Sequence, residues 1–348
     1  MPHAPDFAVT SQRVVTPEGE RAAAVLIKGE KILDVVSQHN IPEGCPVEDV
    51  GNDVVMPGLV DVHVHINEPG RTEWEGFETA TKAAASGGIT TLVDMPLNCI
   101  PVTTTFDALN SKIASTKNKL FVDCGFYGGL IPGNLNDIEP LARAGVLGFK
   151  TFMSHSGIDE FPKVAESHLR KALSILVDKA IPVLVHAELE NGVETSNSHH
   201  TYESFQATRP KSWENNAIKL MIQLCREYET HIHIVHLSSS DILPEISQAR
   251  DEGLPLTVET CPHYLHFTSE RISDGDTRFK CAPPIWGADN REKLWLGLEK
   301  GTIDFITSDH SPCTPELKKL DTGDFQMAWG GISSIQFTLP VIWTECRQ

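Results

Sequence analysis

The sequence has 348 residues, of which 40% are hydrophobic and 22% are charged, so it can form one large α/β domain with a smaller appendage. Its formal net charge is −18 without a basic stripe or tail, which argues against nucleic acid or an anionic membrane surface as a partner. The eight cysteines form no Cys-x-x-Cys pair and the N-terminus lacks signal-peptide features, so we expect a cytoplasmic protein, with a peroxisomal or mitochondrial location left open.

The first 56 residues have the pattern of strands and turns. Two apolar runs, residues 24–27 and 32–36, flank the turn at residues 28–31, which is typical of a β-hairpin. Residues 16–19 are another turn signal upstream. We therefore expect residues 1–56 to form a small all-β unit.

From residue 57 to residue 348, short apolar runs alternate with longer segments of helical periodicity. This alternation is typical of parallel strands covered by helices, and eight repeats favour a closed (β/α)₈ barrel over an open sheet. The expected helices include residues 74–87, 167–180, 214–228 and 240–252. The expected strands are residues 59–65, 90–95, 120–127, 147–152, 182–186, 231–236, 255–260 and 303–308.

Reactive side chains stand at the ends of several expected strands, which is where a barrel of this class carries its catalytic groups. His63 and His65 share one face of the first strand because side chains alternate along a strand. Two imidazoles on one face can converge on one cation, and imidazole suits zinc, iron or cobalt. The remaining candidates for this metal centre are Lys150, His186, His236 and Asp309.

Each of these residues also has a simpler interpretation. A single strand-end histidine is commonly a hydrogen-bonded structural residue, Lys150 could pair with a carboxylate, and Asp309 could cap a helix or a turn. The sixth expected strand contains three histidines: His231 and His233 share a face, and we select His236 because it lies nearest to the strand's C-terminal end. The coincidence of these residues at so many strand ends favours the metal centre.

Lys150 needs a separate chemical explanation, because an ammonium group repels cations and has no acceptor atom. Burial among apolar neighbours lowers the lysine pKa from about 10.4 and leaves a free amine. That amine can add carbon dioxide, and the carbamate that results can bridge two divalent cations roughly 3.5–4 Å apart. Asp309 is then expected to ligate, to accept a proton from the activated water, and to pass it to the departing amide nitrogen.

These motifs resemble those of the cyclic amidohydrolases, a family that includes dihydroorotases, dihydropyrimidinases (hydantoinases) and allantoinases. The resemblance rests on residues 56–65, Lys150, His186, His236 and residues 308–312. It implies a distorted barrel, a small β-sandwich built from both chain ends, and a binuclear centre with N6-carboxylysine at Lys150. Zinc is the leading cation that it implies, with iron, manganese or cobalt as alternatives, and the family is typically homotetrameric.

Within this family, three stretches resemble the allantoinases: residues 67–76, 94–98 and 280–285. They point to Asn67, Asn98 and Cys281 as substrate contacts, although Asn98 also fits a turn residue. Dihydroorotases usually have an arginine at the position of Asn67, where it meets a substrate carboxylate, whereas an amide suits a neutral ureide. Arg71 could supply the missing charge, so a dihydroorotase remains an alternative.

The resemblance implies metal-dependent opening of the hydantoin ring of (S)-allantoin to allantoate, a step of purine catabolism. The alternatives are a dihydropyrimidinase-type hydrolase and an inactive structural relative. The sequence ends at residues 343–348, inside the helix expected after the eighth strand, whereas the family continues and completes its sandwich. We therefore expect the C-terminal part of the sandwich to be absent from this chain, which is the one observation in favour of the inactive relative.

Overall fold

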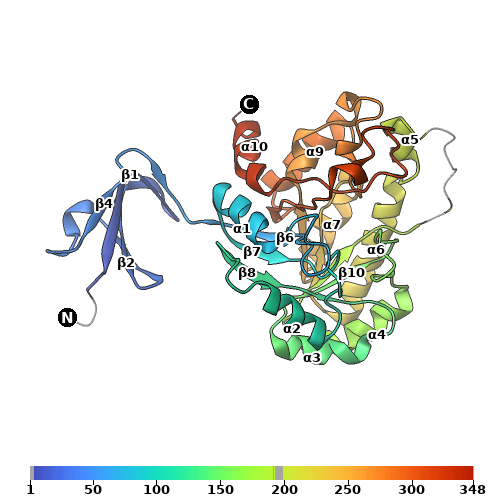
Figure 1. Ribbon diagram of the computed structural model, residues 1–348, viewed down its shortest axis with the longest axis horizontal. Coiled ribbons are helices and arrows are strands. Elements are labelled where there is room, and N and C mark those ends of the chain that lie inside the picture. The colour runs from blue at the N-terminus through green and yellow to red at the C-terminus, as the bar shows by residue number, and fades with distance from the viewer. Residues whose placement is uncertain (1–3, 191, 193–198, 348) are drawn as a thin grey trace. The chain divides into compact units, whose positions relative to one another are not determined.

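The computed structural model describes residues 4–190, 192 and 199–347. Its internal contacts divide the chain into two units, Met1–Leu59 and Val60–Gln348. The first unit is a mixed sheet in the order β3-β2-β1-β4, with β5 beside β1 (Figure 1). Its strands are β1 (Phe7–Thr16), β2 (Gly19–Lys28), β3 (Lys31–Val36), β4 (Val47–Asp49) and β5 (Val54–Val55).

The predicted hairpin in the first unit is confirmed. Strands β2 and β3 pair antiparallel, and their ladder closes where Lys28 faces Lys31. One face of the sheet buries a small apolar cluster, because alternate residues of a strand point to the same side. The cluster consists of Val14, Ala23 and Val25.

The second unit is a barrel of parallel strands with helices outside it (Figure 1). Two ladders, β6-β7-β8 and β9-β10-β11-β12-β13-β14, meet where β8 and β9 follow each other in the chain, and the bridge from Val64 to His310 closes the ring. The eight predicted strands and the barrel class are confirmed within the described residues, and the third predicted strand, residues 120–127, appears as β8 followed after one residue by the short β9, so nine labelled strands form the barrel. The strands are β6 (Leu59–Val64), β7 (Ile89–Asp94), β8 (Asp123–Phe126), β9 (Gly128–Gly129), β10 (Phe149–Phe152), β11 (Val183–His186), β12 (Ile232–Ile234), β13 (Leu256–Thr260) and β14 (Phe305–Ile306).

The helices follow the strands as expected. They are α1 (Phe77–Ser86), α2 (Phe106–Ser115), α3 (Ile138–Ala144), α4 (Glu166–Leu176), α5 (Tyr202–Ala207), α6 (Lys211–Tyr228), α7 (Leu243–Asp251), α8 (Pro262–His266), α9 (Ala288–Glu299) and α10 (Thr338–Glu345). Short 3₁₀ helices span Gln38–Asn40, Leu135–Asp137, Ser240–Ile242, Ser269–Arg271, Thr277–Phe279, Pro315–Lys318 and Ile335–Phe337. Of the helices described here, none combines the length and apolar character needed to cross a membrane.

Helix α1 begins three residues later than the sequence pattern predicts. The amide of Trp74 bonds to the carbonyl of Arg71 at 2.9 Å, so the chain makes a turn where the helix was expected. The Glu68 carboxylate then accepts the amide of Phe77 at 3.0 Å, which caps the first turn of the helix. A side chain distant from the helix therefore sets its start.

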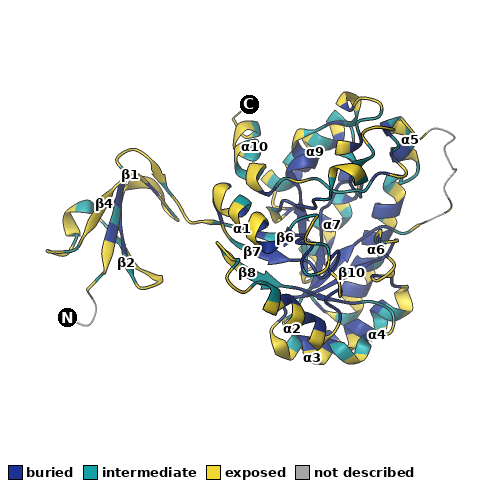
Figure 2. Cartoon of the chain, viewed as in Figure 1, coloured by how far each residue is buried: buried dark blue, intermediate teal, exposed yellow. Residues whose placement is uncertain are grey.

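Alternation along β10 and β11 decides which side chains enter the barrel. Phe149 belongs to the large apolar cluster shared with the helices, whereas Phe152 belongs to a second cluster that includes Leu184. In the register of the ladder, Lys150 faces Leu184 and Phe152 faces His186. Lys150 and His186 therefore share the interior side of the sheet. Buried residues concentrate along these strands and on the helix faces beside them (Figure 2).

A buried ion pair between Asp94 and Lys112 stabilises the loop after β7. The Asp94 carboxylate accepts the amide of Ile66 at 2.7 Å and lies 2.5 Å from Nζ of Lys112, which also donates to the Met95 carbonyl at 2.9 Å. Both charged side chains are fully buried. Burial would lower the pKa of Lys112, but attraction to Asp94 outweighs it and raises that pKa above its usual value. The pair thus links the ends of β6 and β7.

Replacing Lys112 with Met leaves the Asp94 carboxylate buried without its cation, and breaking a buried pair in this way costs about 3–5 kcal/mol. We expect Lys112→Met to lower the free energy of unfolding by that amount in urea denaturation followed by circular dichroism. The control is Lys117→Met at an exposed lysine of the same segment, for which we expect a change below about 0.5 kcal/mol. Equal losses in the two variants would contradict a specific role for the pair.

Candidate metal centre and pocket

A pocket of about 410 Å³ gathers side chains from the carboxyl ends of five strands. These ends lie far apart in the sequence but at one mouth of the barrel, because all eight strands run in parallel. The predicted site residues in the pocket lining are His65, Lys150, His186, His236, Asp309, Asn98 and Cys281. His63 is fully buried and contacts this group from within the barrel.

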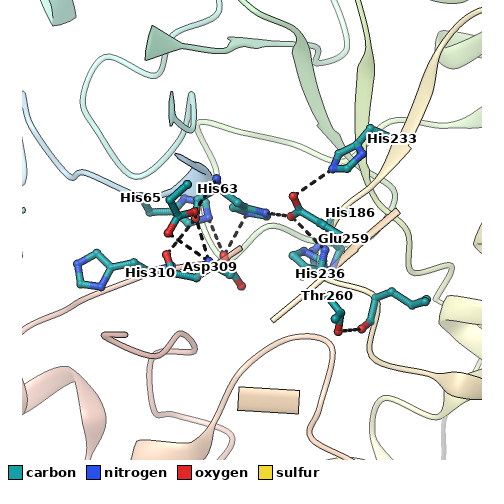
Figure 3. A network of polar contacts seen from close by, with 12 residues as sticks. His63, His65, His186, His233, His236, Glu259, Thr260, Asp309 and His310 are labelled. Atoms are coloured by element: carbon teal, nitrogen blue, oxygen red, sulfur yellow. Dashed lines mark hydrogen bonds and ion pairs between the residues drawn. The ribbon is translucent and has the colours of Figure 1, made fainter. Parts of the chain in front are cut away.

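The first-strand histidines meet the aspartate that follows β14. Nε2 of His63 and Nε2 of His65 lie 3.1 and 3.2 Å from Oδ1 of Asp309 (Figure 3). The φ angles of Asp309 and His236 are 44° and 39°, in the left-handed region that costs a non-glycine residue about 1–3 kcal/mol. Backbone strain of this kind concentrates at functional sites. The strained backbone directs the side chains of Asp309 and His236 toward the cluster, and this conformation lowers the stability of the fold.

The second pair of histidines also converges. Nδ1 of His186 lies 2.9 Å from Nε2 of His236, and the His236 ring centre is 5.4 Å from that of His63. Burial holds the pKa of His236 well below its usual range, so its ring is neutral near pH 7. His63, His236 and Asp309 each place a ligand atom within 4.8 Å of the others. A neutral imidazole offers a lone pair, which a cation can bind.

Lys150 is buried in the same pocket, with no hydrogen-bond partner for Nζ among the described residues. Burial lowers its pKa to about 8, despite attraction to Asp309 and Glu259. Nζ lies 5.1 Å from the ring centre of Phe152, which stacks on His186 at 4.5 Å. The amine is therefore beside the histidines and is not held by a carboxylate.

The donor atoms of this group fit a divalent metal centre. Nitrogen atoms that are buried without a partner lose their hydration and are destabilising unless another group binds them. Within the described part of the chain, the cluster contains Nδ1 of His65, Nζ of Lys150 and Nδ1 of His236 as atoms of this kind. Nε2 of His63 faces Oδ1 of Asp309, and nitrogen with carboxylate oxygen is the donor set that zinc, iron, manganese and cobalt accept.

Sequence reasoning missed the carboxylate behind the first histidine. Glu259 in β13 is fully buried and bonds to Nδ1 of His63, and its other oxygen lies 3.1 Å from Nε2 of His233 (Figure 3). Burial would raise the pKa of Glu259, but His63 and His233 hold it well below its usual range. A carboxylate inside a buried strand was the available signal, because such a group needs a cation or a strong donor.

A second missed carboxylate orients His186. Glu188 accepts a hydrogen bond from Nε2 of His186 at 2.6 Å. Arg209 donates hydrogen bonds from Nε and Nη2 to the two carboxylate oxygens of Glu188. Burial would raise the pKa of Glu188, but Arg209 and His186 lower it to about 2. The carboxylate fixes the proton on Nε2 of His186, so the lone pair on Nδ1 faces His236.

The predicted substrate contacts divide into two groups. Asn98 lines the pocket with φ of 71°, and its carbonyl accepts a bond of 2.8 Å from Nη1 of Arg71. Cys281 lines the pocket too, with 2% of its surface exposed. Asn67 is fully buried, donates to the Pro312 carbonyl at 3.4 Å, and is not among the described residues that line the pocket.

His263 is a further buried imidazole to which the sequence assigned no role. Neither of its ring nitrogens has a hydrogen-bond partner in the described residues, and burial lowers its pKa to about 4. His263, Cys261 and Asp309 each have a ligand atom within 4.8 Å of the others. This second group shares Asp309 with the histidine cluster, so it belongs to the same centre.

Comparison with known proteins places these features in context. The Amidohydrolase family pattern matches residues 54–337. The chain is 48% identical to an allantoinase of Streptomyces avermitilis (99% of this chain, 77% of the relative) and 48% identical to an allantoinase of Arabidopsis thaliana (99% and 72%). It is similar to the solved L-hydantoinase (dihydropyrimidinase) from Arthrobacter aurescens, with a TM-score of 0.90 and 31% identity over 97% of this chain and 76% of that chain.

Lys150→Met tests the electrostatic cost of the buried amine. Because the pKa of Lys150 falls from 10.5 to about 8, the folded state disfavours its charge by roughly 3 kcal/mol, at about 1.4 kcal/mol per pKa unit. In buffer free of metal and carbon dioxide, we expect the variant to be more stable than the parent by that amount below pH 8. The difference should fade as the pH rises from 8 to 10.5, where the unfolded lysine also loses its proton. Urea denaturation at pH 7 and pH 10 measures it, and a destabilised variant at pH 7 would contradict the assignment.

Glu188→Gln tests the orientation of His186, because the amide keeps the shape of the side chain but loses its charge. Loss of a carboxylate behind a ligating histidine typically weakens metal binding by about 10–100-fold. We expect that loss for one zinc equivalent, measured by competition with a chromophoric chelator. The matched control is Glu190→Gln, two residues along the chain, whose carboxylate pairs with Lys163. Equal zinc affinity in both variants would rule out the orienting role.

Proposed function

The chain belongs to the amidohydrolase family, and from this premise we propose that it hydrolyses the hydantoin ring of (S)-allantoin to allantoate in purine catabolism. The observation that carries the proposal is the convergence of ligating side chains from five strand ends on one pocket, with the buried amine of Lys150 among them. The match of 99% of this chain to allantoinases from Streptomyces avermitilis and Arabidopsis thaliana supports allantoin over other cyclic amides.

The metal centre of this proposal takes two divalent cations, with zinc first and iron, manganese or cobalt as alternatives. When bound, such a pair supplies an activated water and a polarised scissile carbonyl near pH 7. The orphaned buried nitrogens support this use of the cluster. The ligands are His63 and His65 for the first cation, His186 and His236 for the second, Lys150 as N6-carboxylysine between them, and Asp309.

The surroundings of Lys150 support its carboxylation. Its lowered pKa leaves an appreciable fraction of neutral amine near pH 7. The nitrogen lone pair attacks the carbon of carbon dioxide, a carbamate C–N bond forms, and one proton leaves to solvent. The product carries a negative charge, which the neighbouring imidazoles and a bound cation stabilise.

Asp309 is the catalytic proton carrier in this proposal. Burial would raise its pKa, but His63 holds it well below its usual range, so the group is a carboxylate near pH 7. Oδ1 already faces both first-strand histidines, at 3.1 and 3.2 Å. From that position the carboxylate accepts a proton from the attacking water and delivers it to the ring nitrogen as the amide bond breaks.

The bonds already made by the nearby arginines and by Lys280, whose ammonium group binds two backbone carbonyls, support a neutral substrate over a carboxylate. Arg71, the one residue that kept the dihydroorotase alternative open, donates to the Asn98 carbonyl at 2.8 Å and lies 3.3 Å from the Glu160 carboxylate. It is not among the described residues that line the pocket, and Arg209, which does line it, holds Glu188. Asn98 and Cys281 line the pocket and are proposed contacts to the ureide, and Asn67 stays a prediction from the sequence.

Three further assignments are proposed from the sequence and the family. The functional domains are residues 1–56, part of a small β-sandwich, and residues 57–348, the barrel. The assembly is a homotetramer, as is typical of the family. The location is cytoplasmic, with peroxisomal or mitochondrial residence as the alternative.

Asp309→Asn tests both the substrate and the proton carrier. We expect the parent protein to prefer allantoin to dihydrouracil and dihydroorotate, and the variant to lose about 10²–10⁴-fold in kcat, the usual contribution of a general acid–base group. Ring opening is followed for the three substrates, and metal content is measured in the same preparations. The control is Asp321→Asn at an exposed carboxylate, which should keep full activity.

Two outcomes would overturn the proposal. A preference for dihydrouracil would favour the dihydropyrimidinase alternative. Purified protein that binds no metal even after reconstitution with zinc and bicarbonate, and that turns over none of the three substrates, would favour the inactive relative.

A further inference from the structure

One side of the pocket is a loop without regular secondary structure, residues 326–331, which we call the wall loop. Each of its six residues lines the pocket. The loop lies twenty residues after β14, and the residue that follows it, Ile332, forms a bridge to His310. The contacts of the loop itself determine the shape of the pocket on this side.

Lys280 holds the first half of the wall loop. Its ammonium group donates to the carbonyl of Gln326 at 3.1 Å and to the carbonyl of Ala328 at 2.6 Å. The backbone carbonyl of Lys280 in turn accepts the amide of Gly331 at 2.9 Å. Lys280 itself lines the pocket, so this bonding network lies at the substrate boundary.

Lys318 holds the second half. Its ammonium group donates to the carbonyl of Trp329 at 3.2 Å and to the carbonyl of Gly331. Gly331 has φ of 114° and a hypothetical Cβ would lie 2.6 Å from the carbonyl oxygen of Ser311, so the chain is tightly fitted at this end. Two lysines from different segments thus bind four carbonyls of one six-residue loop.

These lysines are unusual in lacking a carboxylate partner among the described residues, since half-buried ammonium groups normally pair with one. Burial, followed by repulsion from Arg209 and Lys318, lowers the pKa of Lys280 to about 8. Burial also lowers the pKa of Lys318. The four bonds from these ammonium groups to wall-loop carbonyls compensate for part of the cost of burying the two charges.

We propose that Lys280 and Lys318 are positioning residues that hold the wall loop in the shape required to bind the substrate. Charge-assisted bonds to carbonyls are stronger than neutral ones, and four of them restrain the wall loop. The effect falls on substrate binding, because neither ammonium group contacts the proposed metal ligands. The kinetic part of this inference rests on the proposed function.

Lys280→Met and Lys318→Met test the inference by removing the charge and the donors while keeping an unbranched side chain. We expect each to raise KM for allantoin about tenfold, the equivalent of one charge-assisted bond, while kcat stays within about threefold. Hydrogen exchange followed by mass spectrometry should show faster exchange at the amides of residues 326–332 and unchanged exchange in the barrel strands. Lys280→Arg and Lys318→Arg, which keep the charge, should recover at least part of the binding.

The matched control is Lys319→Met, because Lys319 is adjacent to Lys318 and no hydrogen bond of its ammonium group to the wall loop is seen in the described residues. We expect KM and loop exchange to match the parent. If a methionine variant does not fold, Lys→Gln at the same position replaces it.

The inference and the proposed function fail separately. Unchanged exchange of residues 326–332 in both lysine variants, or exchange that rises equally throughout the barrel, overturns the positioning role even if the parent hydrolyses allantoin. A parent protein without allantoin hydrolysis overturns the proposed function, and the exchange measurement still decides whether the lysines hold the loop.

Discussion

Closure of a parallel barrel is the constraint on which the site depends. Every strand runs in the same direction, so residues at the carboxyl ends of β6, β10, β11, β12 and β14 reach one mouth although hundreds of positions separate them. Alternation along each strand then selects the inward side chains: Lys150 and His186 share the interior side, as their ladder register requires. The bridge from Val64 to His310 closes the ring and brings Asp309 beside His63 and His65.

The metal-centre cluster combines buried nitrogen atoms that lack hydrogen-bond partners with carboxylates that are already hydrogen-bonded. Among the described residues, Nδ1 of His65, Nζ of Lys150 and Nδ1 of His236 are buried without hydrogen-bond partners, whereas the carboxylates behind the cluster are paired: Glu259 bonds two histidines and Glu188 is held by Arg209. Such an arrangement is costly for the isolated protein, as the left-handed backbone of His236 and Asp309 also indicates. Binding of divalent cations would offset these costs, which is the physical reason to regard the cluster as a metal centre.

The sequence predicts the parts of this arrangement that depend on periodicity. Strand alternation and the positions of His63, Lys150 and Asp309 at strand ends follow from patterns within short segments. Glu259 illustrates the opposite case, since its partner His63 is 196 positions away and nothing local identifies the contact. The wall loop lies beyond prediction for the same reason: Lys280 meets carbonyls 46 and 48 positions along the chain. Asn67 fits the amide pattern of a substrate contact, yet its side chain is turned toward Pro312. The side chain of a polar residue after a strand can adopt several orientations, and tertiary packing determines which one it takes.

The measurement that tests the account most directly is X-ray diffraction from crystals grown with zinc and bicarbonate, collected on both sides of the zinc absorption edge. The account predicts two anomalous peaks roughly 3.5–4 Å apart, one beside His63 and His65 and one beside His186 and His236, with density for a carbamate on Lys150 between them. A single peak, peaks away from these residues, or an unmodified Lys150 paired with a carboxylate would contradict it.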